Sequence, residues 1–234
     1  MLKRAAHPSK SATHSTSLRR RKISLPSSDF KPAPVPADAT LSELRAAAAK
    51  CHACPLYAHA TQTVFGEGPA KAHIVFVGEQ PGDSEDRAGH PFIGPAGQLL
   101  NRALTEIGID RPSAYVTNAV KHFKWEPRGK RRLHSKPNGR EITACKPWLA
   151  AELTCLRPKV LVLLGSTAVQ SVLGSAARVL RDRGRCLPSE FCSQTVITVH
   201  PSSLLRAPDE AARHAAYAQF VQDLRVAQKL LAGK

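Results

Sequence analysis

Residues 73–100 read HIVFVGEQPGDSEDRAGHPFIGPAGQLL, and this stretch decides the fold. It begins with an uninterrupted apolar run typical of a buried strand and ends at the start of an amphipathic helix. Further strand patterns at 115–118, 160–164 and 195–199 alternate with helix patterns at 96–107, 141–156, 166–173 and 211–231. Continuous apolar strands separated by helices indicate a parallel sheet with helices on both faces. We therefore predict an α/β fold with three α/β/α layers around a central, mostly parallel four-stranded sheet.

Four polar segments follow the four predicted strands. They are GEQPGD at 78–83, NAVKH at 118–122, GS at 165–166 and HPSS at 200–203. Because ligands of open α/β sheets bind beyond the carboxyl ends of the strands, we expect these segments to form the functional site. In the loop after the first strand, Glu85 and Asp86 are predicted to be solvated acids. Phe92 is either a core residue or a platform on which a base stacks.

The charge of the chain indicates a polyanionic partner. The 234 residues carry a net charge of +16, and the sequence pI is about 10.1. Residues 1–37 hold 8 lysines and arginines against 1 acid, and the other residues hold 26 against 17, so the folded part is basic too. We predict a disordered basic tail at 1–38 and one domain at 39–234, whose first helix follows the N-cap Thr40. The tail also has the composition of a transit peptide, but a disordered tail is the favoured interpretation.

The cysteines bear on compartment and metal binding. No apolar run approaches the about 18 residues of a membrane span, and no secretory signal precedes the cysteines. We therefore expect a cytoplasmic protein with no membrane contact. In a reducing compartment the Cys51-x-x-Cys54 pair indicates a metal or redox centre rather than a disulfide. Cys186 and Cys192 receive only a structural role.

The strand-end motifs together resemble those of the uracil-DNA glycosylase superfamily. The resemblance rests on Pro91-Phe92 in the first loop, Asn118 after the second strand, LLG at 163–165 and HPS at 200–202. The CxxCPL motif at 51–56 narrows it to the iron–sulfur branch, family 4 and its relatives. The resemblance covers residues from about 45 to 230 and implies uracil excision in base excision repair. It implies uracil-containing DNA as the partner, with single strands preferred, and a monomer.

The resemblance also implies a 4Fe–4S cluster on four ligands. Cys51, Cys54 and Cys145 match three of the cysteines, but His122 stands where the family has another cysteine after the Asn-x-x-Lys motif. Imidazole can replace thiolate on the iron of such clusters, so His122 is the expected fourth ligand. Cys155 is the alternative ligand. It lies ten residues past Cys145, about 15 Å along the same predicted helix, and is expected to be a small core residue instead.

A long basic insert at 123–137 separates this chain from ordinary family-4 enzymes. Its KRRLH segment at 130–134, with GEQPGD in the first loop, resembles the UdgX-type subgroup. In that subgroup a histidine of this loop attacks the sugar once uracil has left, and a covalent protein–DNA bond forms. The resemblance implies this role for His134. Without the resemblance, His134 beside a basic run would be read as a phosphate contact.

The remaining roles combine the resemblance with charge logic. His200 is the expected hydrogen-bond donor to the departing uracil, and Glu79 is expected to orient His134 or take its proton. The expected uracil contacts are Gln80, Gly82, Asp83, Phe92 and Asn118. The expected DNA-phosphate contacts are Ser202, Ser203, Arg206, Lys130, Arg131 and Arg132.

Three functions stay open from the sequence. The first is a uracil-DNA glycosylase that traps deoxyribose on His134. The second is a multiple-turnover family-4 glycosylase that leaves abasic sites. The third is a non-catalytic iron–sulfur module that binds nucleic acid.

Overall fold

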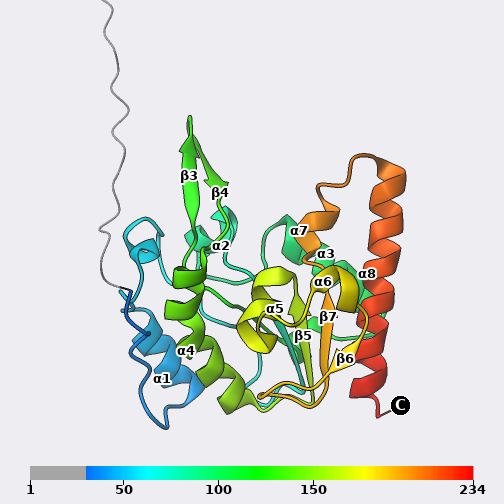
Figure 1. Cartoon of the computed structure of the whole chain (residues 1–234), viewed down its shortest axis with the longest axis horizontal. Helices are drawn as coiled ribbons and strands as arrows, with labels where there is room; N and C mark the ends of the chain where they lie inside the picture. Colours follow the sequence, from blue (N-terminus) through cyan, green and yellow to red (C-terminus); the bar gives the residue numbers. More distant parts are fainter. Residues whose placement is uncertain (1–29, 234) are drawn as a thin grey trace, which may run out of the picture.

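The computed structural model describes residues 30–233. This part of the chain forms a five-stranded sheet in the order β2-β1-β5-β7-β6 and a separate two-stranded hairpin. Figure 1 shows the hairpin rising beyond one end of the sheet, apart from the helical layers. The strands are β1 (Ile74–Gly78), β2 (Tyr115–Asn118), β3 (Trp125–Arg128), β4 (Arg131–His134), β5 (Val160–Leu164), β6 (Cys186–Leu187) and β7 (Thr195–Thr198).

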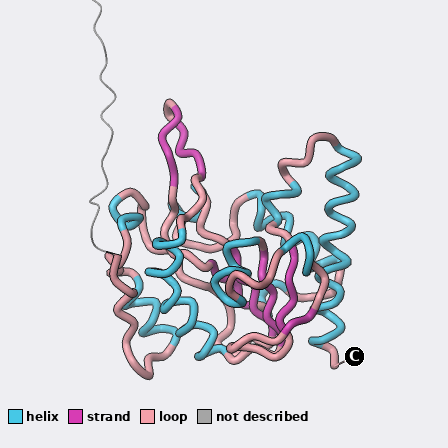
Figure 2. The backbone as a smooth tube through the Cα atoms, in the orientation of Figure 1, coloured by secondary structure: helices cyan, strands magenta, loops and turns pink. Residues whose placement is uncertain are grey.

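Helices cover both faces of the sheet, and Figure 2 shows the strands enclosed between them. Within β1, side chains alternate between two apolar cores. Ile74 and Phe76 face α3 (Pro95–Glu106) and α8 (Glu210–Leu231), and Val75 and Val77 face α4 (Gly139–Leu156) and α5 (Ser166–Leu173). The helices are α1 (Leu41–Ala48), α2 (Asp83–Ala88), α3 (Pro95–Glu106), α4 (Gly139–Leu156), α5 (Ser166–Leu173), α6 (Val179–Asp182), α7 (Pro201–Leu204) and α8 (Glu210–Leu231), with 3-10 turns η1 (Pro55–Ala58) and η2 (Arg111–Ser113).

The predicted three-layer α/β/α fold is confirmed, with one strand more than the four predicted. β1, β2, β5 and β7 pair in parallel. The additional strand, β6, pairs antiparallel with β7 at the edge and has two residues, too few to give a sequence pattern. The N-cap predicted at Thr40 is confirmed, and it forms a capping box in which Thr40 and Glu43 bond each other's backbone.

Two predictions about disorder and exposure need correction. The tail predicted for 1–38 falls mostly outside the described residues, but residues 30–38 lie within them. There Ala33 is buried, and its N–H donates to the carbonyl of Ala144 at 3.0 Å. Cys155, expected in the core, is exposed. None of the described helices combines the length and apolar character needed to cross a membrane.

Candidate active site

A pocket of about 860 Å³ opens at the carboxyl end of the sheet. Each of the four predicted polar segments contributes to its wall, as expected of parallel strands that end at one edge. Lys136, Pro95 and Val179 also line it, and the sequence patterns did not single them out. The residues from the predicted segments are Glu79, Gln80, Gly82, Asp83, Asn118, Gly165, Ser166, His200, Ser202 and Ser203.

Phe92 and Asn118 both line this pocket, and both side chains lie close to Gly78 at the end of β1. A side chain at Gly78 would collide with both of them, so the glycine permits their approach. Phe92 has a positive φ of 58° and is buried in the core while also lining the pocket. Phe92 is therefore a core residue, as one of the two interpretations predicted, and its place in the pocket lining leaves the stacking of a base on it as a prediction.

His200 is held as a neutral hydrogen-bond donor. It caps α7, and its Nδ1 accepts from the backbone N–H of Ser202 at 3.2 Å. Since Nδ1 is an acceptor there, the ring proton resides on Nε2. The pKa of His200 is lowered to about 4, mainly by burial and also by the neighbouring His134 and Arg206. The neutral ring can thus donate its Nε2–H to an oxygen that gains negative charge in the pocket.

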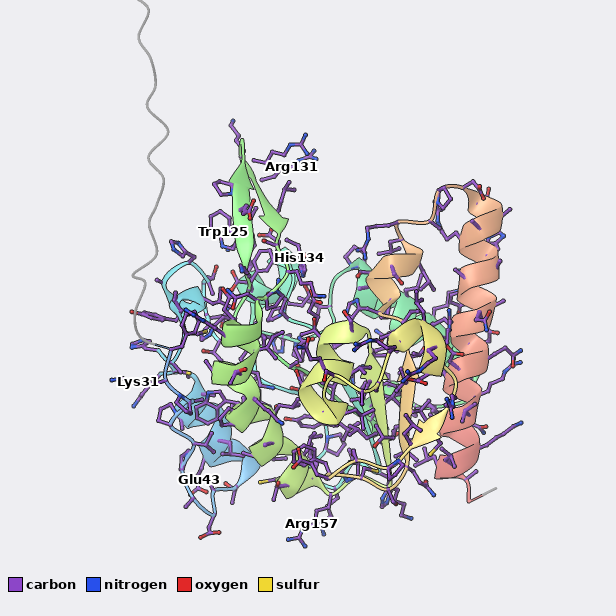
Figure 3. All side chains as sticks on the ribbon, in the orientation of Figure 1. Lys31, Glu43, Trp125, Arg131, His134 and Arg157 are labelled. Carbon is purple, nitrogen blue, oxygen red and sulfur yellow. The ribbon has the colours of Figure 1, made fainter. Side chains whose placement is uncertain are left out.

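His134 lies at the base of β4, and Figure 3 shows it on the side of the hairpin that faces α7. Its Nε2 is 3.4 Å from a carboxylate oxygen of Glu79, whose other oxygen accepts from the hydroxyl of Thr167 at 2.5 Å. Burial lowers the pKa of His134, an effect that Glu79 opposes and Arg206 reinforces. The imidazole is therefore neutral near pH 7, with a carboxylate beside it to accept a proton.

Arg132 fastens the hairpin to the body of the protein. Its guanidinium pairs with Asp83 and Asp86, the latter at 2.7 Å, and lies within 5.5 Å of the ring centroids of Phe123 and Trp125. Its side chain is only 13% exposed. Arg132 was expected to contact DNA phosphate, but in this structure its Nε and Nη1 donors engage two carboxylates and join the hairpin to α2.

Glu85 and Asp86 of α2 are buried, which corrects the expectation that they are solvated. Asp86 accepts from the backbone N–H of Thr61 at 2.9 Å in addition to binding Arg132. Glu85 accepts from the N–H groups of Gly82 and Gly94 at 3.1 and 2.9 Å. These carboxylates hold the first loop in place through charge-assisted bonds, and the local sequence alone does not reveal such distant partners.

Gln80 joins the two ends of the hairpin. Its amide nitrogen donates to the carbonyls of Lys124 and Ser135, both at 3.1 Å, and its oxygen accepts from the N–H of Lys124 at 3.2 Å. Gln80 lines the pocket, but both of its amide hydrogens are engaged by the hairpin. The residue expected to contact a base thus also fixes the position from which His134 projects.

The remaining predicted phosphate contacts lie on two sides of the pocket. Lys130 and Arg131 are exposed at the tip of the hairpin, where Figure 3 labels Arg131. Arg206 is exposed beyond α7, and it donates to the hydroxyl of Ser202 at 3.3 Å. Ser203 is exposed beside it. Basic groups therefore flank the opening between the hairpin and α7.

Cys51, Cys54 and Cys145 are buried in one apolar cluster below the hairpin. The indole N–H of Trp148 points to the sulfur of Cys51 at 3.2 Å, and the backbone N–H of Lys121 points to that of Cys145 at 3.3 Å. Burial raises the pKa of Cys145 to about 12 and that of Cys54 to about 11. A bound metal would supply the positive charge that ionises such thiols.

His122 fits a ligand role through the tautomer that its neighbour imposes. The hydroxyl of Thr63 donates its single hydrogen to the carbonyl of Ala48 at 2.9 Å. The same oxygen lies 2.9 Å from Nε2 of His122, so it accepts a proton from that nitrogen. Nδ1 is left with a free lone pair, as a metal-binding imidazole requires. Burial also lowers the pKa of His122, to about 4, which keeps the ring neutral.

No group of three or more His, Cys, Asp or Glu side chains within residues 30–233 is placed to hold a single metal ion. Among the other cysteines, Cys155 and Cys186 are exposed and Cys192 is buried. Cys155 bonds the carbonyl of Ala39 at 3.3 Å, outside the buried cluster.

Comparison with known proteins assigns the family. The model of the uracil DNA glycosylase superfamily matches residues 65–225. The chain belongs to the uracil-DNA glycosylase superfamily. The matched range contains β1, β2, β5, β7 and every strand-end segment of the pocket. The glycosylase motifs expected from the sequence resemblance are therefore borne by the elements that form the site.

Three relatives narrow the assignment to type-4 enzymes. A type-4 uracil-DNA glycosylase of Pyrobaculum aerophilum is 37% identical over 175 residues, 72% of this chain and 86% of the relative. That of Thermotoga maritima is 40% identical over 67% of this chain and 79% of its own length. That of Sulfurisphaera tokodaii is 33% identical over 73% and 78%. This chain is accordingly a type-4-like glycosylase, which sets the non-catalytic module aside.

Proposed function

We propose that this glycosylase excises uracil from DNA and keeps the resulting deoxyribose attached covalently to His134. The observation that carries the proposal is the His134 imidazole 3.4 Å from the Glu79 carboxylate, on the wall of a pocket that Phe92, Asn118 and His200 also line. A nucleophile with a proton acceptor at hand is the arrangement that covalent catalysis needs.

The pocket suits a flipped uracil. Phe92 offers an aromatic face on which the ring stacks, and the Asn118 amide can pair with the edge of the base. As the glycosidic bond breaks, its electron pair leaves with uracil and positive charge develops on the sugar. The Nε2–H of His200 stabilises the negative charge on uracil, and this preorganised donor lowers the barrier.

Capture completes the reaction. A lone pair of the His134 imidazole forms a bond to the anomeric carbon vacated by uracil, and the ring proton passes to Glu79. The hydroxyl of Thr167 holds Glu79 in position. An imidazole fixed above the sugar outcompetes water because it reacts as if at very high local concentration. No water attacks, so no abasic site is released.

The hairpin contacts support capture over turnover. Arg132 and Gln80 both fix the hairpin, one near its middle and one at its two ends. Arg132 and His134 are two residues apart on β4 and so face the same side. Holding Arg132 against α2 therefore holds His134 over the pocket.

A 4Fe–4S cluster on Cys51, Cys54, Cys145 and His122 is part of the proposal. The cluster supplies a structural cross-link when bound and requires no redox role. The three cysteines share one buried environment, and Thr63 leaves Nδ1 of His122 free to bind iron. The four proposed ligands come from three segments. Cys51 and Cys54 precede β1, His122 follows β2, and Cys145 lies in α4.

The DNA contact is proposed to be a single strand bound by a monomer in repair of uracil-containing DNA. Arg206 lines the pocket beyond α7, and Lys130 and Arg131 are exposed on the hairpin whose His134 also lines it, so phosphates can be held on either side. Ser202 and Ser203 add hydroxyl groups near Arg206. Such contacts position the strand without reading its sequence.

One experiment tests the covalent step. The protein is mixed with a uracil-containing single-stranded oligonucleotide and resolved on a denaturing gel. We expect a slowly migrating, SDS-resistant band with wild type and none with His134→Ala. His90→Ala is the matched control, since His90 is exposed and pairs with Glu67 outside the pocket. Abasic sites in molar excess over wild-type protein would contradict capture and establish turnover.

A further inference from the structure

Leu180 is the most exposed large apolar side chain among the described residues. It is 84% exposed, whereas Tyr57, Ile93 and Leu205 reach 42%. Leaving a leucine in water forgoes about 1.5–3 kcal/mol of burial free energy. A single exposed leucine is ordinary on a protein surface, so its position and surroundings decide whether it has a function.

The turn that presents Leu180 is firmly held. Asp182, the last residue of α6, is buried, and its carboxylate accepts from the backbone N–H of Arg178 at 2.8 Å. The same carboxylate pairs with Arg181 at 2.8 Å and Arg185 at 3.1 Å. Leu180 therefore projects from a preorganised turn, which reduces the entropy lost when a partner binds it.

Leu180 stands next to the uracil pocket. Its neighbour Val179 lines the pocket, and Leu205 lines the same pocket from α7's end. Figure 1 shows α6 and α7 at the end of the sheet where the pocket opens. An exposed leucine is followed by an exposed arginine at both places, as Leu180-Arg181 and Leu205-Arg206.

The charge around Leu180 suits a nucleic-acid strand. Arg178, Arg181 and Arg185 are exposed, and the acid among them, Asp182, is buried. The two arginines that pair with Asp182 keep 62% of their side chains exposed, so their remaining donors face solvent. An apolar tip within a basic surface matches the alternation of bases and phosphates in DNA.

We propose that Leu180 packs on the nucleobase adjacent to the uracil in the bound strand, while Arg181 and Arg185 bind the phosphates beside it. When uracil rotates into the pocket, its neighbour loses a stacking partner and exposes an apolar face. Leu180 covers that face, as apolar wedges do in other proteins that unstack DNA. The proposal rests on the proposed function for the presence of a flipped base.

Affinity for uncleavable DNA tests the contact. The ligand is a single-stranded oligonucleotide with one 2′-fluorinated deoxyuridine, whose glycosidic bond resists cleavage. Leu180→Gln should weaken binding roughly tenfold, the size expected when one base loses a stacking partner. Leu180→Met keeps an apolar side chain of similar length and should bind within about twofold of wild type. Because Leu180 is exposed, both variants should melt as wild type does.

Removing the neighbouring base identifies the partner. Two further oligonucleotides replace the base on one or the other side of the fluorinated uridine by an abasic spacer. On one of them, wild type and Leu180→Gln should bind equally, because the base that Leu180 covers is gone. The proposal would be overturned if wild type and Leu180→Gln bound the intact oligonucleotide equally. It would also be overturned if Leu180→Gln still bound more weakly than wild type to both spacer oligonucleotides.

The phosphate contacts and the parent function have separate readouts. Arg185→Gln should lower the slope of log affinity against log salt by about 0.7, the value for one phosphate on a single strand. Wild type is also assayed for adduct on cleavable DNA. If Leu180→Gln weakens binding but wild type forms no adduct, the proposed function is wrong and the Leu180 contact stands. If wild type forms adduct but Leu180→Gln binds as tightly as wild type, the proposed function stands and the Leu180 contact is wrong.

Discussion

The cysteine cluster and the hairpin lie in neighbouring parts of the molecule but are held by different forces. Around Cys51, Cys54 and Cys145 the contacts are apolar and buried. The hairpin is largely exposed and is attached through the polar contacts of Arg132 and Gln80. A buried apolar cluster stabilises the whole domain, whereas a few polar contacts can set the position of one side chain. Mutations should therefore affect stability in the first region and chemistry in the second.

Removing a proposed ligand of the iron–sulfur cluster should have the largest effect, and this effect should be on stability. Cys145→Ala deletes a side chain that is fully buried and one proposed ligand of the iron–sulfur cluster. We expect a loss of at least about 3 kcal/mol, which lowers Tm by about 6–12 °C in a domain of this size. The visible absorbance of the cluster should disappear. Thermal unfolding and an absorption spectrum measure the two effects.

Cys192→Ala is the control for that variant. Cys192 is also buried, but it contacts the carbonyls of Pro158 and Lys159 away from the cluster. It should retain the iron and its absorbance. Equal loss of iron from both variants, or a Cys145→Ala protein as stable as wild type, would remove the difference drawn between the two regions.

Releasing the hairpin should have the next largest effect. We expect this effect on the covalent step and not on stability. Arg132→Gln removes the guanidinium that joins β4 to Asp83 and Asp86. His134 then loses its fixed position, and a displacement of about 1 Å can slow a reaction about 100-fold. We expect adduct formation to slow by that order while uracil release continues. Single-turnover assays that separate adduct, free uracil and abasic DNA measure both steps.

Arg131→Gln is the matched control, since Arg131 lies one residue away but is exposed. It should weaken DNA binding slightly and leave the ratio of adduct to free abasic DNA unchanged. The same change of ratio in both variants would show that charge, and not position, governs capture. Loss of uracil release in Arg132→Gln would show that the pocket itself depends on the hairpin.

The sequence patterns predicted the sheet and the strand-end segments but missed the hairpin contacts. The reason is that these contacts join residues far apart in the sequence. Apolar runs such as 160–164 report local burial, and parallel topology then brings their ends together. Arg132 sits in a basic run, and its partners Asp83 and Asp86 lie more than 40 positions away. A local pattern contains no information about such pairs, so Arg132 resembled a phosphate contact and Asp86 a solvated acid.

Lowering the pH should have a smaller effect, a fall in the rate of adduct formation at His134. Burial lowers the pKa of His134 below its ordinary value, and the neutral ring is the nucleophile. Adduct formation should therefore stay constant around pH 7 and fall only as pH drops through that lowered pKa. His200 also stays neutral around pH 7, because burial lowers its pKa to about 4. Single-turnover rates of adduct formation against pH give the profile.

Two substitutions should move that profile in opposite directions. Glu79 raises the pKa of His134, so Glu79→Gln should shift the fall to lower pH as well as slow the reaction. Arg206 lowers the same pKa, so Arg206→Gln should shift the fall to higher pH. Profiles that move together, or not at all, would show that another group limits capture.

The segment at 30–36 offers the smallest effect, and it belongs to the cysteine region. Phe30 and Val35 pack against the cysteine cluster, and the N–H of Lys31 donates to the carbonyl of Ala53 at 3.2 Å. The N–H of Ala33 donates to Ala144, so the segment joins the loop between Cys51 and Cys54 to the helix that carries Cys145. Deleting residues 1–36 should lower Tm by about 2–4 °C, equivalent to about 1 kcal/mol. Deleting residues 1–29 keeps both hydrogen bonds and should leave Tm unchanged. If both deletions leave Tm unchanged, the region around Cys51, Cys54 and Cys145 is stable without residues 30–36. The contacts of this segment would then make no contribution to the stability of the fold.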